Sequence, residues 1–249
     1  MAVLVTRPHP DAEATAAALR EKGFAAQLAP MLRFEALPFQ DDADMRYGAV
    51  ILTSANALRG IESHLADPKR LKDLLKLPVF AVGDHTASAA RAAGFAKVIS
   101  AQGDAAGLRD SVASSVKAKE IKKAATLLYL AGADLARDLA GELGERGFTV
   151  VTHTTYRMAQ VRQLPRETCE AFAANQIEAV LHYSRRSARA FLEAARAAGV
   201  EISALAVPQC CISDAVALIL RDAGATQVLT ARSPDENALL GALMRALRP

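Results

Sequence analysis

The stretch Gly48–Ser54 reads GAVILTS, and a related stretch 130 positions later, Glu178–Ser184, reads EAVLHYS. The same offset relates further pairs of identical residues that follow both stretches: Pro78 and Pro208, Asp84 and Asp214, Arg91 and Arg221, Gly94 and Gly224, Val98 and Val228, and Ala101 and Ala231. A repeat of this length exceeds the roughly 20–50 residues of a solenoid unit. We therefore interpret it as a duplicated domain.

Before these stretches the repeat continues at a different offset. Arg20–Phe24 (REKGF) resembles Gly144–Phe148 (GERGF), 124 positions later. Two constant offsets separated by one step indicate duplicated structure in which a single loop differs in length. A chain of 249 residues is long enough for two compact domains. The sequence therefore predicts two lobes.

Short apolar runs alternate with longer stretches of helical spacing along the whole chain. Strands are predicted at Ala2–Thr6, Ala25–Met31, Ala49–Thr53, Val79–Val82, Lys97–Ser100, Thr126–Leu130, Phe148–Thr152, Ala179–Tyr183, Pro208–Ser213 and Gln227–Thr230. Helices are predicted at Asp11–Lys22, Ser54–Leu65, His85–Ala93, Ala105–Val116, Ala133–Arg146, Arg186–Ala198, Ala215–Ala223 and Pro234–Leu247. This alternation is typical of an α/β fold with parallel sheets covered by helices on both faces.

The repeat limits how the chain divides into lobes. Residues 1–33 correspond to 126–152, and residues 48–116 correspond to 178–247, so each lobe needs one piece of each kind. Either the two halves of the chain form the lobes, or the chain crosses to the second lobe and returns. Two extended segments without helix signals, Leu32–Phe39 and Thr154–Arg162, stand at the two crossing points of the second arrangement.

Two such segments can pair as a two-stranded ladder between lobes, which favours the crossover. We accordingly expect the domain boundaries to be as follows: 1–33 with 162–249 as the first, discontinuous lobe, 40–154 as the second lobe, and 34–39 and 155–161 as linkers.

Composition excludes several functional classes. The net charge of the chain is only +3, and its lysines and arginines are dispersed along the sequence. This does not fit the concentrated basic face of a nucleic-acid-binding protein. No window approaches the roughly 18 apolar residues of a membrane span. The three cysteines, Cys169, Cys210 and Cys211, are too few for a disulfide framework, and the chain begins on a strand without a signal-peptide pattern. We expect a cytoplasmic protein.

The familiar cofactor motifs are also missing. The first strand is not followed by G-x-G-x-x-G, and the chain contains no G-K-[ST] loop or G-x-S-x-G elbow. The five histidines lack the spacing of a zinc site. The sequence therefore predicts neither a cofactor nor a metal.

Candidate binding residues lie where predicted strands end, because open α/β sheets bind ligands at the carboxyl ends of their strands. Hydroxyls and N–H groups at helix N-termini suit carboxylates. The candidates are Arg7, Ser54, Asn56, Gly83, Thr86, Ser184, Arg186 and Ser213. The alternative for each Ser or Thr is a helix N-cap, and for each Arg a solvated surface charge.

Several of these segments, in this order, resemble the uroporphyrinogen-III synthases. They are Val3–Pro8, Gly23, Pro30, Thr53–Ala57, Ala81–Ala87, Thr155–Arg157, Tyr183–Ser184 and Ser213–Gly224. The resemblance runs from end to end. It implies two flavodoxin-like lobes joined by a two-stranded β-ladder, with the first lobe discontinuous. It also implies a monomer that needs no cofactor.

The activity implied by the resemblance is conversion of hydroxymethylbilane, a linear tetrapyrrole, to uroporphyrinogen III, with the terminal pyrrole ring inverted. The substrate is expected to come from hydroxymethylbilane synthase. Tyr156 matches a tyrosine of the family and becomes the candidate acid for release of the substrate hydroxyl, and Thr86 matches a family threonine. The chain departs from the family at Val216, where Thr is common, and at Ser213, where Gly is common.

Two other functions fit a two-lobed α/β chain. One is a non-catalytic binding protein for an acidic small molecule, although such receptors are typically exported. The other is a glycosyltransferase, which the modest lobe size and the missing nucleotide-sugar signals disfavour.

Overall fold

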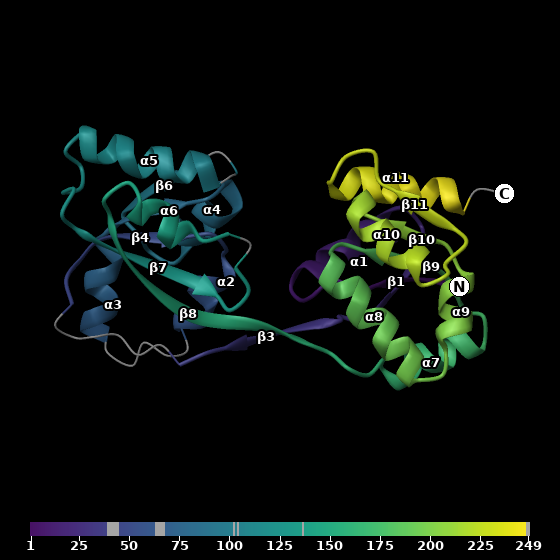
Figure 1. Ribbon diagram of the computed structural model, residues 1–249. Helices are drawn as coiled ribbons and strands as arrows, with labels where there is room; N and C mark the ends of the chain where they lie inside the picture. Colours follow the sequence, from purple (N-terminus) through teal and green to yellow (C-terminus); the bar gives the residue numbers. More distant parts are fainter. Residues whose placement is uncertain (39–44, 63–67, 102, 104, 136, 248–249) are drawn as a thin grey trace. The chain divides into compact units, whose positions relative to one another are not determined.

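The computed structural model describes residues 1–38, 45–62, 68–101, 103, 105–135 and 137–247. Residue contacts divide the chain into unit 1, Met1–Phe34 with Ala159–Pro249, and unit 2, Glu35–Met158 (Figure 1). Phe39 of the expected first linker, residue 40 at the expected start of the second lobe, and residues 63–65 of an expected helix lie outside the described part.

Unit 1 contains a five-stranded sheet in the order β11-β10-β9-β1-β2, with parallel pairings. Its elements are β1 (Ala2–Val5), α1 (Asp11–Glu21), β2 (Ala25–Leu28), α7 (Arg166–Ala173), β9 (Ile177–His182), α8 (Arg185–Ala197), α9 (Glu201–Ala206), β10 (Gln209–Cys211), α10 (Asp214–Asp222), β11 (Val228–Thr230) and α11 (Glu236–Ala246). Counted along the chain, the strand order is 2-1-3-4-5, which is the flavodoxin order.

Unit 2 contains a six-stranded sheet in the order β3-β8-β7-β4-β5-β6. Its elements are β3 (Leu32–Ala36, which begins in unit 1), β4 (Tyr47–Leu52), α2 (Asn56–Glu62), α3 (Pro68–Leu75), β5 (Pro78–Ala81), α4 (Asp84–Ala92), β6 (Lys97–Ser100), α5 (Ala105–Lys117), β7 (Thr126–Gly132), α6 (Leu139–Gly144) and β8 (Thr149–Gln160). Without β3, the strands of unit 2 are arranged as in unit 1. The strand–helix–strand piece that comes first along the chain in unit 1 (β1-α1-β2) comes last in unit 2 (β7-α6-β8). The two flavodoxin-like lobes expected from the sequence are confirmed.

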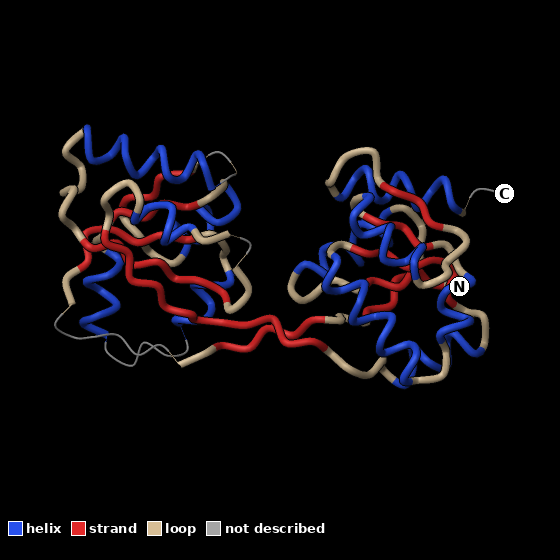
Figure 2. The backbone as a smooth tube through the Cα atoms, in the orientation of Figure 1, coloured by secondary structure: helices blue, strands red, loops and turns tan. Residues whose placement is uncertain are grey.

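Helices cover both faces of each sheet (Figure 2). In unit 1, alternate residues of β1 point to opposite sides: Leu4 packs with α7–α10, whereas Val3 and Val5 pack with α1 and α11. In unit 2, α5 and α6 cover one face, and α2, α3 and α4 cover the other. Among the described residues, no helix has the length and apolar character needed to cross a membrane.

The duplication is visible in detail. Residues 81–100 and 211–230 have the same sequence of buried, half-buried and exposed positions. Gly94 and Gly224 end the repeated helices with φ of 96° and 97°, a left-handed conformation that glycine adopts without a steric penalty. The repeated glycines are therefore required by the same helix ending in both units.

Strands β3 and β8 are neighbours and run in opposite directions. The N–H of Val161 donates to the carbonyl of Met31 (3.0 Å), and the N–H of Leu37 donates to the carbonyl of Thr155 (2.8 Å). Arg157 and Glu35, opposite each other in the same register, form an ion pair of 2.6 Å. The expected two-stranded ladder is therefore present.

Strand β8 is longer than expected. It runs without a break from Thr149 to Gln160, across the gap between the predicted strand Phe148–Thr152 and the segment Thr154–Arg162. Its sequence, TVVTHTTYRMAQ, contains no Pro or Gly and is rich in β-branched residues, which favour extended backbone.

Helix α6 is shorter than the predicted helix Ala133–Arg146. The side chain of Asp138 accepts a hydrogen bond from the N–H of Gly141 (2.9 Å), so the helix begins at Leu139. The described residues between Gly132 and Asp138 consequently form a loop. Helices α3, α7 and α9 were not predicted from the sequence.

Candidate functional site

A cavity of about 360 Å³ opens at the carboxyl ends of β4 and β7 in unit 2. Among the side chains and backbone that line it are Thr53, Ser54, Tyr129, Gly132, Arg137 and Tyr156. The order of strands along the chain reverses between β4 and β7, and such switch points are where open α/β sheets bind ligands. This is the strongest candidate for a site within unit 2.

Tyr156, the predicted acid, is half-buried in the wall of this cavity. It lies on β8 opposite Gly132 of β7, and the N–H of Ala133 donates to its carbonyl (2.9 Å). A Cβ atom placed on Gly132 would lie 2.6 Å from Cζ and 2.8 Å from Oη of Tyr156. The phenol ring therefore rests directly on the Gly132 backbone.

A second phenol, that of Tyr129, lines the same cavity and is 2% exposed. Its Oη is 3.0 Å from Oγ1 of Thr53. Burial raises the pKa of Tyr129, the hydrogen bond with Thr53 opposes this shift, and the nearby Tyr156 adds to it. Tyr129 is consequently a neutral phenol at physiological pH, and sequence reasoning had not selected it.

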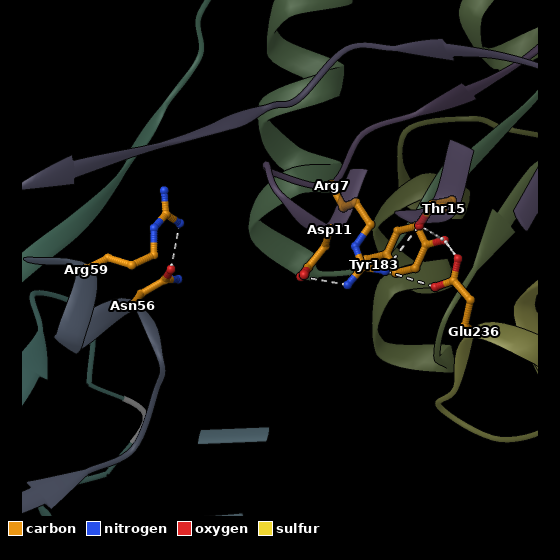
Figure 3. A network of polar contacts seen from close by, with 7 residues as sticks. All are labelled: Arg7, Asp11, Thr15, Asn56, Arg59, Tyr183 and Glu236. Atoms are coloured by element: carbon orange, nitrogen blue, oxygen red, sulfur yellow. Dashed lines mark hydrogen bonds and ion pairs between the residues drawn. The ribbon is translucent and has the colours of Figure 1, made fainter. Parts of the chain in front are cut away.

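Ser54 and Asn56 stand where β4 leads into α2. The Ser54 Oγ accepts a hydrogen bond from the N–H of Asn56 (3.2 Å), as in a local turn. The Asn56 Oδ1 accepts from Arg59 (3.0 Å), as Figure 3 shows. Only Ser54 of these two residues lines the cavity.

Gly83 and Ser213 occupy matching positions, directly before α4 and α10. Both are extended, with φ of −161° and −157°, and neither helix has a side-chain cap. Gly83 does not line the cavity, although its neighbour Val82 does. Thr86 and Val216, in the first turns of the two helices, are 5% and 3% exposed and thus equally buried.

In unit 1, Arg7 belongs to a compact polar network (Figure 3). Its guanidinium contacts Asp11 (2.8 Å) and Glu236 (2.9 Å) and lies 4.3 Å from the centre of the Tyr183 ring. The Tyr183 hydroxyl donates to Glu236 (2.9 Å) and lies 3.2 Å from Oγ1 of Thr15. Arg7, which the sequence placed at a substrate site, is thus already paired with two carboxylates.

Burial is the main reason why the pKa of Tyr183 is strongly raised, although its hydrogen bond with Thr15 opposes the shift. Ser184 and Arg186 follow Tyr183 at the start of α8. The Ser184 Oγ accepts from the N–H of Ser187 (3.1 Å), so this serine is an N-cap, and Arg186 is exposed.

The two switch points have diverged. At the repeat offsets, Arg7, Asp11, Thr15 and Tyr183 of unit 1 correspond to Ala131, Leu135, Leu139 and Thr53 of unit 2. Unit 2 therefore has no counterpart of the arginine–carboxylate network at these positions. Its switch point instead borders the cavity that contains both phenols.

Several cavity residues come from the loop after β7, which had been predicted as helix: Asp134, Leu135 and Arg137. Arg137 pairs with Glu142 (2.9 Å). The sequence signal that could have found this loop is Asp138, followed three residues later by a helical N–H that it caps. Within the described ranges, no group of three or more side chains is arranged to hold a metal ion.

Comparisons with known proteins agree across the chain. A family model for uroporphyrinogen-III synthase HemD matches residues 13–241. The crystal structure of uroporphyrinogen-III synthetase from Helicobacter pylori is similar, with 19% identity, 99% coverage of both chains and a TM-score of 0.65. A mutant uroporphyrinogen III synthase from the thermophilic bacterium Thermus thermophilus shares 17% identity over 99% of both chains, with a TM-score of 0.53. No curated protein sequence matches.

Proposed function

Since the chain belongs to the uroporphyrinogen-III synthase family, we propose that it cyclises hydroxymethylbilane to uroporphyrinogen III, inverting the terminal pyrrole ring and releasing water. The family match spans both units, which supports a role for each of them. It also favours an enzyme over the non-catalytic binding protein. The reaction loses only water and needs no oxidant or reductant, so we propose that it proceeds without a cofactor.

We assign the role of acid to Tyr156. Its phenol donates a proton to the substrate hydroxyl, the carbon–oxygen bond breaks, and water departs. This leaves an electrophilic protonated azafulvene and the Tyr156 phenolate. The substituted carbon of the far ring attacks this centre, and the resulting spiro intermediate fragments and recloses with that ring inverted. The proton lost when the ring regains aromaticity returns to the Tyr156 oxygen. A positioned acid contributes roughly 10²–10⁴-fold.

The observation that supports this assignment is the position of Tyr156 in the cavity of unit 2, beside Tyr129. A cavity of about 360 Å³ stands at the lower end of the roughly 300–1,000 Å³ of small-molecule sites. We therefore propose that it receives one pyrrole ring of the four. Ser54, Asn56 and Gly83 would bind carboxylates of this part of the substrate.

In unit 1, we propose that Arg7, Ser184, Arg186 and Ser213 bind further carboxylates. Asp11, which is more exposed than Arg7, is the group that a substrate carboxylate would replace at the guanidinium. We also propose that hydroxymethylbilane synthase supplies the substrate and that the enzyme is a cytoplasmic monomer. The three unpaired cysteines fit a reducing compartment.

The activity is tested with freshly prepared hydroxymethylbilane in the presence of a chelator and without added nucleotide. We expect isomer III as the product, whereas the uncatalysed reaction gives isomer I. Chromatographic separation of the two isomers is the measurement. Isomer I as the only product at stoichiometric enzyme would refute the proposed function.

Thr86→Val is expected to keep the melting temperature close to that of the wild type, because Val216 fills the matching position in unit 1. If the Thr86 hydroxyl binds substrate, loss of one hydrogen bond of about 0.5–2 kcal/mol lowers turnover roughly 2–30-fold. The measurements are calorimetry and kcat/KM, with Val216→Thr as the matched control. Unchanged kcat/KM would remove Thr86 from the site.

A further inference from the structure

We propose that Gly132 is a positioning residue: its lack of a side chain seats the Tyr156 ring against the backbone of β7 and sets where the phenol hydroxyl stands in the cavity. The inference rests on the acid role proposed above for Tyr156. Gly132 is not among the site residues expected from the sequence.

The contact is too close for any side chain at position 132. An added Cβ would stand 2.6 Å from Cζ, 2.8 Å from Oη and 3.0 Å from Cε1 of Tyr156. Non-bonded carbon atoms prefer about 3.5–4.0 Å. Moreover, Gly132 is not among the glycines with a positive φ, so an alanine here meets the ring and not backbone strain. The substitution therefore acts on the position of Tyr156.

The register of the strands creates this contact. Gly132 pairs with Tyr156 only because the pairing of β7 with β8 shifts by one residue between Ala131 and Gly132. The hydrogen bond from the Ala133 N–H to the Tyr156 carbonyl then holds the two backbones together. Such irregularities commonly redirect a side chain at a functional site.

The backbone of β8 is held in place next to Tyr156. Thr155 is fully buried, and its hydroxyl lies within hydrogen-bond distance of the carbonyls of Ala57 (3.2 Å) and Ala131 (3.3 Å). On the helix side, a Cβ on Gly60 would lie 2.3 Å from the Thr155 carbonyl oxygen, so α2 packs tightly on this strand. With the strand held from two sides, a methyl group at position 132 displaces the ring.

The ring also has apolar neighbours. Tyr156 packs against the cluster that includes Val50, Leu52 and Leu130. Displacement of the ring by Gly132→Ala is consequently expected to weaken this packing and to move the phenol hydroxyl. A misplaced acid lowers kcat more than it raises KM.

The test is a double-mutant cycle of Gly132→Ala with Tyr156→Ala, measured by kcat, KM, melting temperature and tyrosine circular dichroism. The chain has four tyrosines and no tryptophan, so the Tyr156 signal is accessible as the difference between backgrounds. Gly144→Ala is the matched control, because nothing lies within 4 Å of a Cβ at that position.

We expect Gly132→Ala to lower kcat toward the level of Tyr156→Phe, by up to about 10²-fold, and to alter the Tyr156 signal. In the Tyr156→Ala background, which removes the ring, the same substitution should cost neither rate nor melting temperature. An unchanged rate and signal in Gly132→Ala, or equal losses in both backgrounds, would overturn the proposal.

Failure to fold is also decisive. If Gly132→Ala is insoluble but folds together with Tyr156→Ala, the ring contact is the cause, and if both fail, the proposal is wrong. Tyr156→Phe separates this inference from the proposed function. If Tyr156→Phe keeps the wild-type rate, Tyr156 is not the acid. The circular dichroism and melting temperatures of the Gly132→Ala variants still test whether Gly132 positions the ring.

Discussion

Tyr156→Phe is expected to lower the rate of isomer III formation by roughly 10²-fold or more, because it removes only the O–H group whose proton releases the substrate hydroxyl. The ring keeps its seat on Gly132 and its contact with the apolar cluster, so the melting temperature should stay close to that of the wild type. The measurement is kcat with chromatographic resolution of isomers I and III.

Tyr129→Phe is the matched control, since it removes the second phenol hydroxyl of the same cavity. That hydroxyl is buried and lies within hydrogen-bond distance of Thr53, so its loss should lower stability by about 1–3 kcal/mol and affect the rate less than Tyr156→Phe. Near-normal isomer III formation by Tyr156→Phe would mean that Tyr156 is not the acid. The enzyme would then act mainly by holding the substrate in shape.

His182 is expected to make unit 1 less stable in acid. The imidazole is fully buried, its Nε2 lies 2.9 Å from Oε1 of Gln209, and no partner of its Nδ1 is found in the described part of the chain. Burial lowers the pKa of His182 from 6.5 to about 4, and the hydrogen bond with Gln209 only partly opposes this. Between pH 4 and pH 6.5, His182 is protonated in the unfolded chain but neutral in the folded chain.

The folded state should therefore lose about 1.4 kcal/mol per pH unit as the pH falls from 6.5 to 4, or about 3 kcal/mol in total. Above pH 6.5 the loss is absent. Urea unfolding at a series of pH values measures it. The control is His182→Leu, because the repeat places Leu52 at the same position in unit 2. Its unfolding free energy should depend less steeply on pH, and parallel curves for the two proteins would contradict the prediction.

The sequence predicted most of the elements, and the duplication, from the spacing and order of residues along the chain. Apolar spacing distinguishes a strand such as β4 from a helix such as α8, and a glycine at a helix end, such as Gly94, marks a conformation that other residues avoid. The same patterns located the strand ends, and hence Ser54 beside the cavity, whereas Tyr156 was selected from the resemblance to the family.

Local patterns failed at two places, for different reasons. The loop after β7 carries apolar and charged residues at helical spacing, but the Asp138 cap delays the helix and leaves a cavity wall. Arg7 looks like a free cation in the sequence, whereas Glu236, 229 positions away, pairs with it. The Asp138 cap is a local signal that the helical spacing obscured, whereas the pairing of Arg7 with Glu236 could not be derived from neighbours along the chain.

By itself, the sequence determined that the protein consists of two related α/β lobes whose strand ends supply the candidate polar groups. Periodicity and repeat offsets can be read directly from the order of residues along the chain. Only the tertiary structure decided that the switch point of unit 1 contains an ion-paired network while that of unit 2 borders a cavity. It alone placed Gly132 against Tyr156, since that contact depends on a one-residue shift in the pairing of β7 with β8.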